Sequence, residues 1–537
     1  MRTLRTCLPL ALLLALNWAL LYPRMASPDQ DWDATHVYLP MAAHLLSEGL
    51  GYFRQVASIE MPPFTYTWAA LLGAKLGTVK MANFLLSGAT LALIWRTGWV
   101  LHSEAAGLAA AALFALCPTT KPFLASALSE PPYFLLVALW VWSLAEFYSS
   151  GRRSLLIITA ISLGLASITR GSLFYLLPIL FIFFAVRRER YVAIAHAAAL
   201  TVPVAFILKN FILFGFAFFA TGSGNALYLG HHPVTGGYDP YYLGIMFDTG
   251  SVTQGPGPLA LESERLLAGI AKMMIFQSDP AWLASLYANK LAAFVFVSNA
   301  AIDGDVVLLR SWRIATLILA VAGFRAIASP ALRWIIALAL AYQVIVHIPV
   351  LYTHRYSVGA LDLWLALLAG IGIGALVERR SGAEIGRYVI LLVVSLAAGW
   401  WVYRFGPEPQ LDVLRTRNAL VWEARGVRGV GRMEFNIPPS PLLNTITNYG
   451  IVLDAASGCA NVAVSFRRDG AAEFGRSINR RLDIDGKVHR YQFGVVHPLQ
   501  LQSPGRLRID TACILEIKRI ALYTIDAGLD LRERYLR

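Results

Sequence analysis

The sequence predicts a polytopic α-helical membrane protein of about eleven transmembrane helices, followed by a C-terminal β-sandwich domain outside the membrane. The 537 residues are 57% hydrophobic and only 15% charged, and their mean hydropathy is +0.56. A soluble globule cannot bury so much apolar side chain while so few charges cover its surface. In addition, many apolar segments are close to the 20 residues needed to cross a bilayer. The composition therefore excludes a cytosolic enzyme, a disordered chain and a disulfide-stapled miniprotein.

The apolar segments define the expected membrane domain, residues 1–404. The expected spans are 7–22, 79–99, 104–118, 131–147, 154–169, 171–186, 191–209, 308–324, 334–351, 357–377 and 386–403. Segment 62–77 is broken by Pro62 and Pro63, so we interpret it as a helix lying at the membrane interface, and 289–301 in the same way. The first span has the length of a signal peptide, but no small-residue cleavage site follows it, which favours a retained helix.

The arginines between the spans predict the orientation of the chain. With the N-terminus in the cytoplasm, the basic clusters between spans fall on the cytoplasmic side, as the positive-inside rule requires. These clusters are Arg96, Arg152 with Arg153, Arg187 with Arg188 and Arg190, Arg325 with Arg333, and Arg379 with Arg380. The opposite side then receives the large loops 23–78 and 210–307 and everything after residue 405. The net charge of +13 thus acts as a topology signal, and we expect no nucleic-acid partner.

The C-terminal segment 405–537 has a different pattern. Hydrophobicity drops, short alternating runs appear, and Gly and Pro punctuate them, as in antiparallel β-sandwiches. Carbohydrate binding is one expected role for this domain, although fold alone does not decide its ligand. Cys459 and Cys513 both lie here, and two alternatives stay open: a disulfide in an oxidising compartment, or two buried thiols.

Acidic residues gather on the predicted outer face. Asp29, Asp31 and Asp33 lie within five residues, and such a group can supply a general base or bind a divalent metal. The alternative is an acidic N-cap for the helix that follows. Glu60 and Glu130 share this face, and Glu130 also suits a helix N-terminus.

Basic residues at helix ends on the outer face contradict the positive-inside rule. They are Arg170, Lys209, Arg310 and Arg355. Together they suggest an anion at the outer interface, for which a lipid phosphate is the natural candidate, whereas the alternative is snorkelling to lipid head groups. Asp362 lies within a helix and is expected to pair with an arginine or another polar group.

The order of these features resembles the GT-C glycosyltransferase superfamily over residues 1–403. The resemblance is strongest to bacterial relatives of the protein O-mannosyltransferases and of the aminoarabinose and galacturonic acid transferases of lipid A. It rests on the Asp-rich first outer loop, 43–49 (AHLLSEG), Pro62-Pro63, Ser129-Glu130-Pro131, Thr169-Arg170-Gly171, Lys209-Asn210, Phe214-Gly215, 225–230 (NALYLG) and His354-Arg355-Tyr356.

The resemblance implies an inverting transfer of a sugar from a polyprenyl-phosphate donor to an acceptor outside the membrane. Asp33, or alternatively Asp31, would be the general base, and Glu130 would be the carboxylate of the second outer loop. Arg170 and Arg355 would hold the lipid phosphate. The basic residue that the family places before the first Pro is Met61 here, so Lys121 or Lys209 would replace it.

The resemblance also implies a divalent metal ion, binding partners and a cellular location. Glu60 with His231 or His232 is similar to a divalent-metal pair of some relatives, and no other cofactor is expected. The partners would be membrane lipids, the lipid-linked donor, and a glycan, lipid or protein acceptor. The location would be the inner (plasma) membrane of a bacterial cell, with the C-terminal domain in the periplasm.

Two functions from other classes remain open. A transporter or flippase of lipid-linked sugars would place ionisable residues along a path through the bilayer. A non-catalytic glycan-binding membrane protein would not need the Asp31 and Asp33 site.

Overall fold

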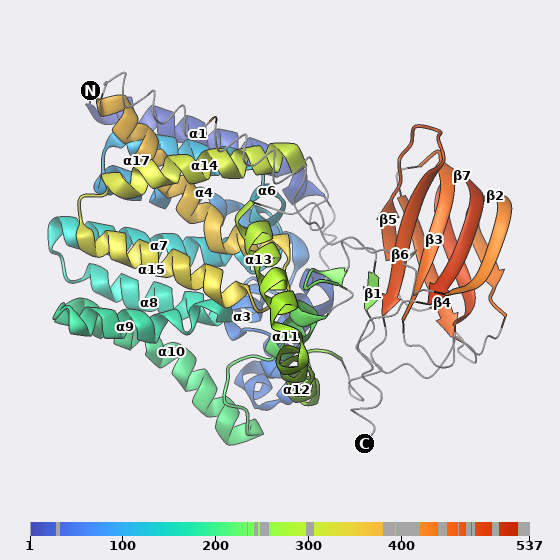
Figure 1. Ribbon diagram of the computed structural model, residues 1–537. Helices are drawn as coiled ribbons and strands as arrows, with labels where there is room; N and C mark the ends of the chain where they lie inside the picture. The colour runs from blue at the N-terminus through green and yellow to red at the C-terminus, as the bar shows by residue number, and fades with distance from the viewer. Residues whose placement is uncertain are drawn as a thin grey trace.

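The computed structural model separates a helical bundle from a β domain (Figure 1). The structure describes residues 2–27, 33–232, 235–240, 245–247, 257–296, 306–379, 393, 419–438, 448–459, 461–468, 474, 478–496 and 504–524. The predicted fold class, a polytopic helical membrane protein with a C-terminal β domain, is confirmed.

The bundle follows the apolar segments of the sequence. Its longer helices are α1 (Arg2–Ala26), α4 (Leu76–Leu101), α5 (Glu104–Leu116), α7 (Glu130–Ser150), α8 (Leu155–Thr169), α9 (Leu176–Val186), α10 (Arg190–Phe214), α14 (Val306–Ala326), α15 (Pro330–His347) and α17 (Leu363–Arg379). Within the described residues, six helical stretches are long and apolar enough to cross a membrane: Leu8–Ala26, Leu76–Leu101, Glu130–Ser150, Arg190–Phe214, Pro330–His347 and His354–Glu378. The expected number of about eleven spans therefore stays a prediction.

The segments assigned to the interface form shorter helices. Within 62–77, the helix α3 covers Pro63–Leu71 and begins at the second proline, where the missing N–H costs no hydrogen bond. Segment 289–301 overlaps α13, which begins earlier, at Pro280, and is described to Phe296. Apart from residue 393, the expected span 386–403 lies outside the described residues, as does the domain boundary near 405.

Small residues bring the bundle helices into close contact. A Cβ atom on Gly323 of α14 would lie 1.7 Å from the Leu368 carbonyl oxygen of α17, and one on Gly372 would lie 2.2 Å from the Leu319 carbonyl oxygen. Only glycine permits this approach, which is the usual packing device between membrane helices.

Ion pairs join helix ends that the arginine pattern assigned to the cytoplasmic side. Arg96 of α4 lies 3.0 Å from Glu146 near the end of α7, and His102 lies 3.2 Å from Glu378 near the end of α17. The opposite end of the bundle carries the loops 23–78 and 210–307 and the helices α2 (Leu39–Glu48), α6 (Lys121–Leu124), α11 (Ser223–His231), α12 (Leu261–Gln277) and α16 (His354–Ser357).

The β domain is built around the long strand β7. Its strands are β2 (Leu420–Asn436), β3 (Asn448–Ser457), β4 (Asn461–Arg468), β5 (Ile478–Arg481), β6 (His489–Val496) and β7 (Pro504–Thr524). β2 pairs with β7 along most of its length, whereas β4 pairs with the first half of β7 and β3 with the second half. Buried side chains of β3, β4, β6 and β7 form one core.

Two links define how this domain is held. The short strand β1 (Ile245–Phe247), which belongs to loop 210–307, pairs in parallel with β6, so that Ile245 faces Gly494. Cys459 and Cys513 form a disulfide whose Cα atoms are 5.6 Å apart, which decides between the two alternatives that the sequence left open.

Candidate functional site

Four charged side chains from distant parts of the chain meet at the end of the bundle opposite to the pairs of Arg96 and His102. Arg355, from α16, forms ion pairs with both Asp33 and Glu130, and Arg170 lies 3.6 Å from the same Glu130 carboxylate. The first outer loop supplies Asp33, the first turn of α7 supplies Glu130, and the end of α8 supplies Arg170. These four residues, which we call the charge cluster, were all predicted from the sequence.

The Arg355 guanidinium is occupied on all three nitrogens. Nε donates to Glu130 and Nη1 donates to Asp33, while Nη2 lies 3.1 Å from the second Glu130 oxygen and 3.2 Å from the Tyr38 hydroxyl. Nη2 also lies 3.4 Å from the Ser129 hydroxyl. Glu130 thus receives Arg355 in a bidentate arrangement, which fixes the plane of the guanidinium. Burial raises the pKa of the Tyr38 phenol to about 12, so this hydroxyl keeps its proton.

Arg170 is held differently from Arg355. Its side chain is 10% exposed and lies between the rings of Tyr133 and Tyr356, 5.4 and 5.7 Å from their centres. Its Nη1 is buried and, within the described part of the chain, has no hydrogen-bond partner. The same nitrogen packs against Gly359, where a Cβ atom would lie only 1.9 Å away. A buried guanidinium N–H without an acceptor is costly, so this donor is suited to an incoming anion.

A π-helical turn lies next to each end of the Arg355 and Asp33 pair. One covers Ala34–Tyr38 and begins directly after Asp33, and the other covers Val358–Asp362 and begins three residues after Arg355. Such turns are rare and concentrate at functional sites, because they change the direction in which neighbouring side chains point. This is independent support for the cluster as the working part of the protein.

The structure adds Asp239 to the surroundings of the cluster. Its backbone N–H donates to the Tyr352 carbonyl at 2.9 Å, and Tyr352 donates to the Gly237 carbonyl at 2.8 Å, which ties this loop to the segment before Arg355. Its carboxylate acts electrostatically on Tyr356, as do Asp33 and both arginines of the cluster. No sequence pattern pointed to Asp239, because it is an isolated acid in a long loop.

The other predicted phosphate ligands make their contacts elsewhere. Lys121 donates to Asn17 of α1 at 3.3 Å, and burial lowers the pKa of its ammonium to about 8. Lys209 donates to the Phe53 carbonyl at 3.0 Å and lies close to three phenylalanine rings. Asp31, the alternative base, and Asp29 lie outside the described residues.

The metal site expected at Glu60 with His231 or His232 stays a prediction. Both ring nitrogens of His231 are engaged, Nδ1 at 2.8 Å from the Leu227 carbonyl and Nε2 at 2.7 Å from the Tyr287 hydroxyl. His232 is buried, which lowers its pKa to about 3, and burial also raises the pKa of Glu60. Among the described residues, no three His, Cys, Asp or Glu side chains are grouped as metal ligands.

A second ion pair lies deeper in the bundle. Arg313 of α14 pairs with Asp362, and both side chains are almost completely buried. Asp362 also accepts from Thr119, and Arg313 donates to Ser357 at 3.1 Å. The prediction that Asp362 pairs with an arginine is therefore confirmed, and the partner comes from a different helix.

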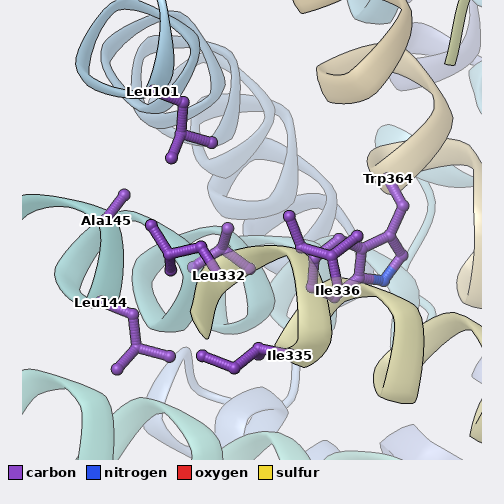
Figure 2. Close-up of a pocket in the computed structure, with 8 residues that line it drawn as sticks. Leu101, Leu144, Ala145, Leu332, Ile335, Ile336 and Trp364 are labelled. Atoms are coloured by element: carbon purple, nitrogen blue, oxygen red, sulfur yellow. The ribbon is translucent and has the colours of Figure 1, made fainter. Parts of the chain in front are cut away.

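The described cavity is separate from this chemistry. Figure 2 shows an apolar pocket that involves side chains of α4, α7, α15 and α17. Its lining is Leu101, Val141, Leu144, Ala145, Leu332, Ile335, Ile336 and Trp364. Leu144 lies about 20 Å along α7 from Glu130 at the usual helical rise. The pocket thus lies towards the opposite end of the bundle and has no polar group that could fix a substrate.

Among known proteins, the chain is similar to solved structures but not to any family or curated protein in sequence. No protein-family model matches the sequence, and no curated protein matches it. The oligosaccharyltransferase AglB of Archaeoglobus fulgidus, solved with an inhibitory peptide and a dolichol-phosphate, aligns at 11% identity and a TM-score of 0.42 over 76% of this chain. The alignment covers 55% of AglB, so this chain spans about half the length of that protein.

A shorter protein aligns along nearly its whole length. ArnT of Cupriavidus metallidurans, solved bound to undecaprenyl phosphate, has 14% identity and a TM-score of 0.30, over 78% of this chain and 93% of its own. At these identities and TM-scores we infer function from the site residues rather than from the likeness.

Proposed function

We propose that this chain is an integral-membrane glycosyltransferase that moves a sugar from a polyprenyl-phosphate carrier to an acceptor hydroxyl outside the membrane. The observation that carries the proposal is the charge cluster, which places a partly exposed carboxylate beside two guanidinium groups at the outer end of apolar helices. A lipid phosphate is an anion that reaches this depth in a membrane.

Asp33 is the proposed general base. Its side chain is 34% exposed, whereas that of Glu130 is fully buried and receives both arginines. Only the exposed carboxylate can take the proton of an acceptor hydroxyl as its oxygen attacks the sugar. Attack opposite to the phosphate inverts the anomeric centre. Glu130 is thus a positioning residue that holds Arg355 and Arg170 in place.

Arg170 and Arg355 are the proposed phosphate ligands. When the bond between the sugar and the phosphate breaks, the electron pair stays on the phosphate oxygen, and the guanidinium groups stabilise that charge. No step of this proposal needs a metal.

The orientation completes the proposal. We place the N-terminus in the cytoplasm and the charge cluster and β domain on the extracytoplasmic side of the inner (plasma) membrane. The disulfide of Cys459 and Cys513 supports this orientation, because disulfides persist in oxidising compartments. The pairing of β1 with β6 supports placing loop 210–307 and the β domain on one side.

The test is turnover of a panel of polyprenyl-phosphate sugars with extracted envelope acceptors, read as donor-dependent release of polyprenyl phosphate. We expect Asp33→Asn to bind donor and to lose about 10²- to 10⁴-fold in rate, the range for removal of a general base. The exposed helix-capping Asp279 offers a matched control, and Asp279→Asn should keep the wild-type rate. Equal rates for all three proteins would contradict the proposal and favour a transporter or a glycan-binding protein.

A further inference from the structure

The two arginines of the charge cluster are not equally available to an anion. Arg355 uses all three nitrogens on Asp33, Glu130, Tyr38 and Ser129. Arg170 Nη1 is buried and makes no hydrogen bond to a described residue, and its nearest printed acceptor is a Glu130 oxygen at 3.6 Å. An incoming phosphate therefore finds a poorly satisfied donor at Arg170, whereas at Arg355 Nη1 it competes with Asp33.

The balance of charges in the cluster requires one carboxylate to leave its arginine when a phosphate binds. Two carboxylates and two guanidinium groups cancel, so the cluster has no spare positive charge when the site is empty. A phosphate bound beside an intact cluster would face two carboxylates at close range. Separating one carboxylate from its arginine creates the positive charge that the phosphate needs.

We propose that the donor phosphate enters at Arg170, takes the Arg355 guanidinium from Asp33, and thereby frees Asp33 to act as the base. This inference rests on the proposed function and adds an order to it, in which the lipid-linked donor binds before the acceptor hydroxyl can be activated.

Asp33 is the carboxylate that leaves, because it is the more weakly held of the two. It accepts from Arg355 through one nitrogen, Nη1, and its side chain is 34% exposed. Glu130 accepts from two nitrogens of Arg355, lies beside Arg170 as well, and is 0% exposed. Moving Asp33 towards solvent costs one ion pair, whereas moving Glu130 would break two and leave a buried charge.

The exchange makes donor binding a condition for the chemistry. On the empty protein the Asp33 carboxylate is neutralised by Arg355, so it is a poor acceptor for a hydroxyl proton. After the exchange, the acceptor hydroxyl transfers its proton to Asp33 while its oxygen bonds to the sugar. The sugar–phosphate bond breaks, and its electron pair remains on the phosphate between Arg170 and Arg355.

The test measures the affinity of undecaprenyl phosphate for the full chain in nanodiscs. Since Asp33 competes with phosphate for Arg355, Asp33→Asn should bind this probe roughly 10- to 100-fold more tightly, the range of one charge-assisted hydrogen bond. Arg170→Gln should bind it more weakly by at least the same factor. Glu146→Gln removes the partner of Arg96 at the other end of the bundle and should bind as the wild type does.

A double-mutant cycle separates competition from simple loss of a nearby negative charge. If Asp33 competes for Arg355, the gain from Asp33→Asn disappears in the Arg355→Gln background, whereas a through-space charge effect persists there. Arg355→Met, which also removes the cation, provides the same comparison if Arg355→Gln does not fold. A gain that persists, or no gain from Asp33→Asn while the wild type binds the probe, would overturn this inference and leave the proposed function standing. Failure of every protein to bind would overturn both.

Discussion

Replacing Gly359 by alanine tests the placement of Arg170 without touching a charged residue. The new Cβ atom would lie 1.9 Å from Arg170 Nη1 and 2.9 Å from its Cζ. A tolerable contact needs about 3.4 Å, so Nη1 must move by roughly 1.5 Å. The atom that moves is the end of a flexible side chain, so the helix keeps its backbone while the guanidinium leaves its position.

The expected loss follows from one charge-assisted hydrogen bond to the phosphate. Such a bond contributes about 1.5 to 3 kcal/mol, which corresponds to a loss of roughly 10- to 100-fold in affinity for undecaprenyl phosphate. The thermal midpoint should change little, because no backbone contact is broken. The assay is equilibrium binding of the lipid in nanodiscs, paired with a thermal unfolding curve of the same sample.

Two glycine controls make this result specific. Gly269 of α12 has no atom within 4 Å of its Cβ position, so Gly269→Ala should leave binding unchanged. At Gly372 the Cβ would lie 2.2 Å from a backbone carbonyl, so Gly372→Ala should destabilise the packing of α14 and α17 instead. Wild-type affinity for a folded Gly359→Ala protein would refute the assignment of Arg170 as a phosphate ligand.

Three further outcomes follow from the structure. Burial lowers the pKa of Lys121 to about 8, so its charge is lost from about pH 7.5 to about pH 9, while the arginines and the lipid phosphate keep theirs. Affinity should stay level over this range, and a decrease that Lys121→Gln abolishes would make Lys121 a phosphate ligand. Asp362→Asn leaves Arg313 buried without its counter-charge and should cost about 3 to 5 kcal/mol in thermal or denaturant unfolding, whereas Arg313→Met combined with Asp362→Leu should cost less. The disulfide of Cys459 and Cys513 joins residues 54 positions apart, so its reduction should lower the stability of the β domain by about 4 kcal/mol. Protease protection measures this loss, and protection that reduction leaves unchanged would contradict the prediction.

The parts of the site that carry charge at a membrane boundary could be predicted from the sequence. An ionisable residue at the end of an apolar helix is costly unless it is paired or functional. This cost singles out Asp33, Glu130, Arg170 and Arg355 in the sequence. The sequence also placed them on one face through the arginine pattern of the opposite loops. It could not say which carboxylate pairs with which arginine, because that depends on how helices far apart in sequence pack.

Other features could not be predicted from the sequence, because they depend on contacts between segments that are far apart in the chain. Gly359 looks like any glycine in a membrane helix, and only the packed structure shows that it makes room for Arg170. Asp239 acts on the cluster only through the pairing of its loop with Tyr352. The division of β7 between β3 and β4 depends on long-range register, which alternation alone does not specify.

A structure of the chain with undecaprenyl phosphate bound in a nanodisc would test the central claim most directly. We predict phosphate oxygens within hydrogen-bond distance of Arg170 Nη1 and of Arg355, with Asp33 no longer paired to Arg355 and Glu130 still in place. A phosphate seated at Lys121 or Lys209, with the pair of Asp33 and Arg355 intact, would contradict the account.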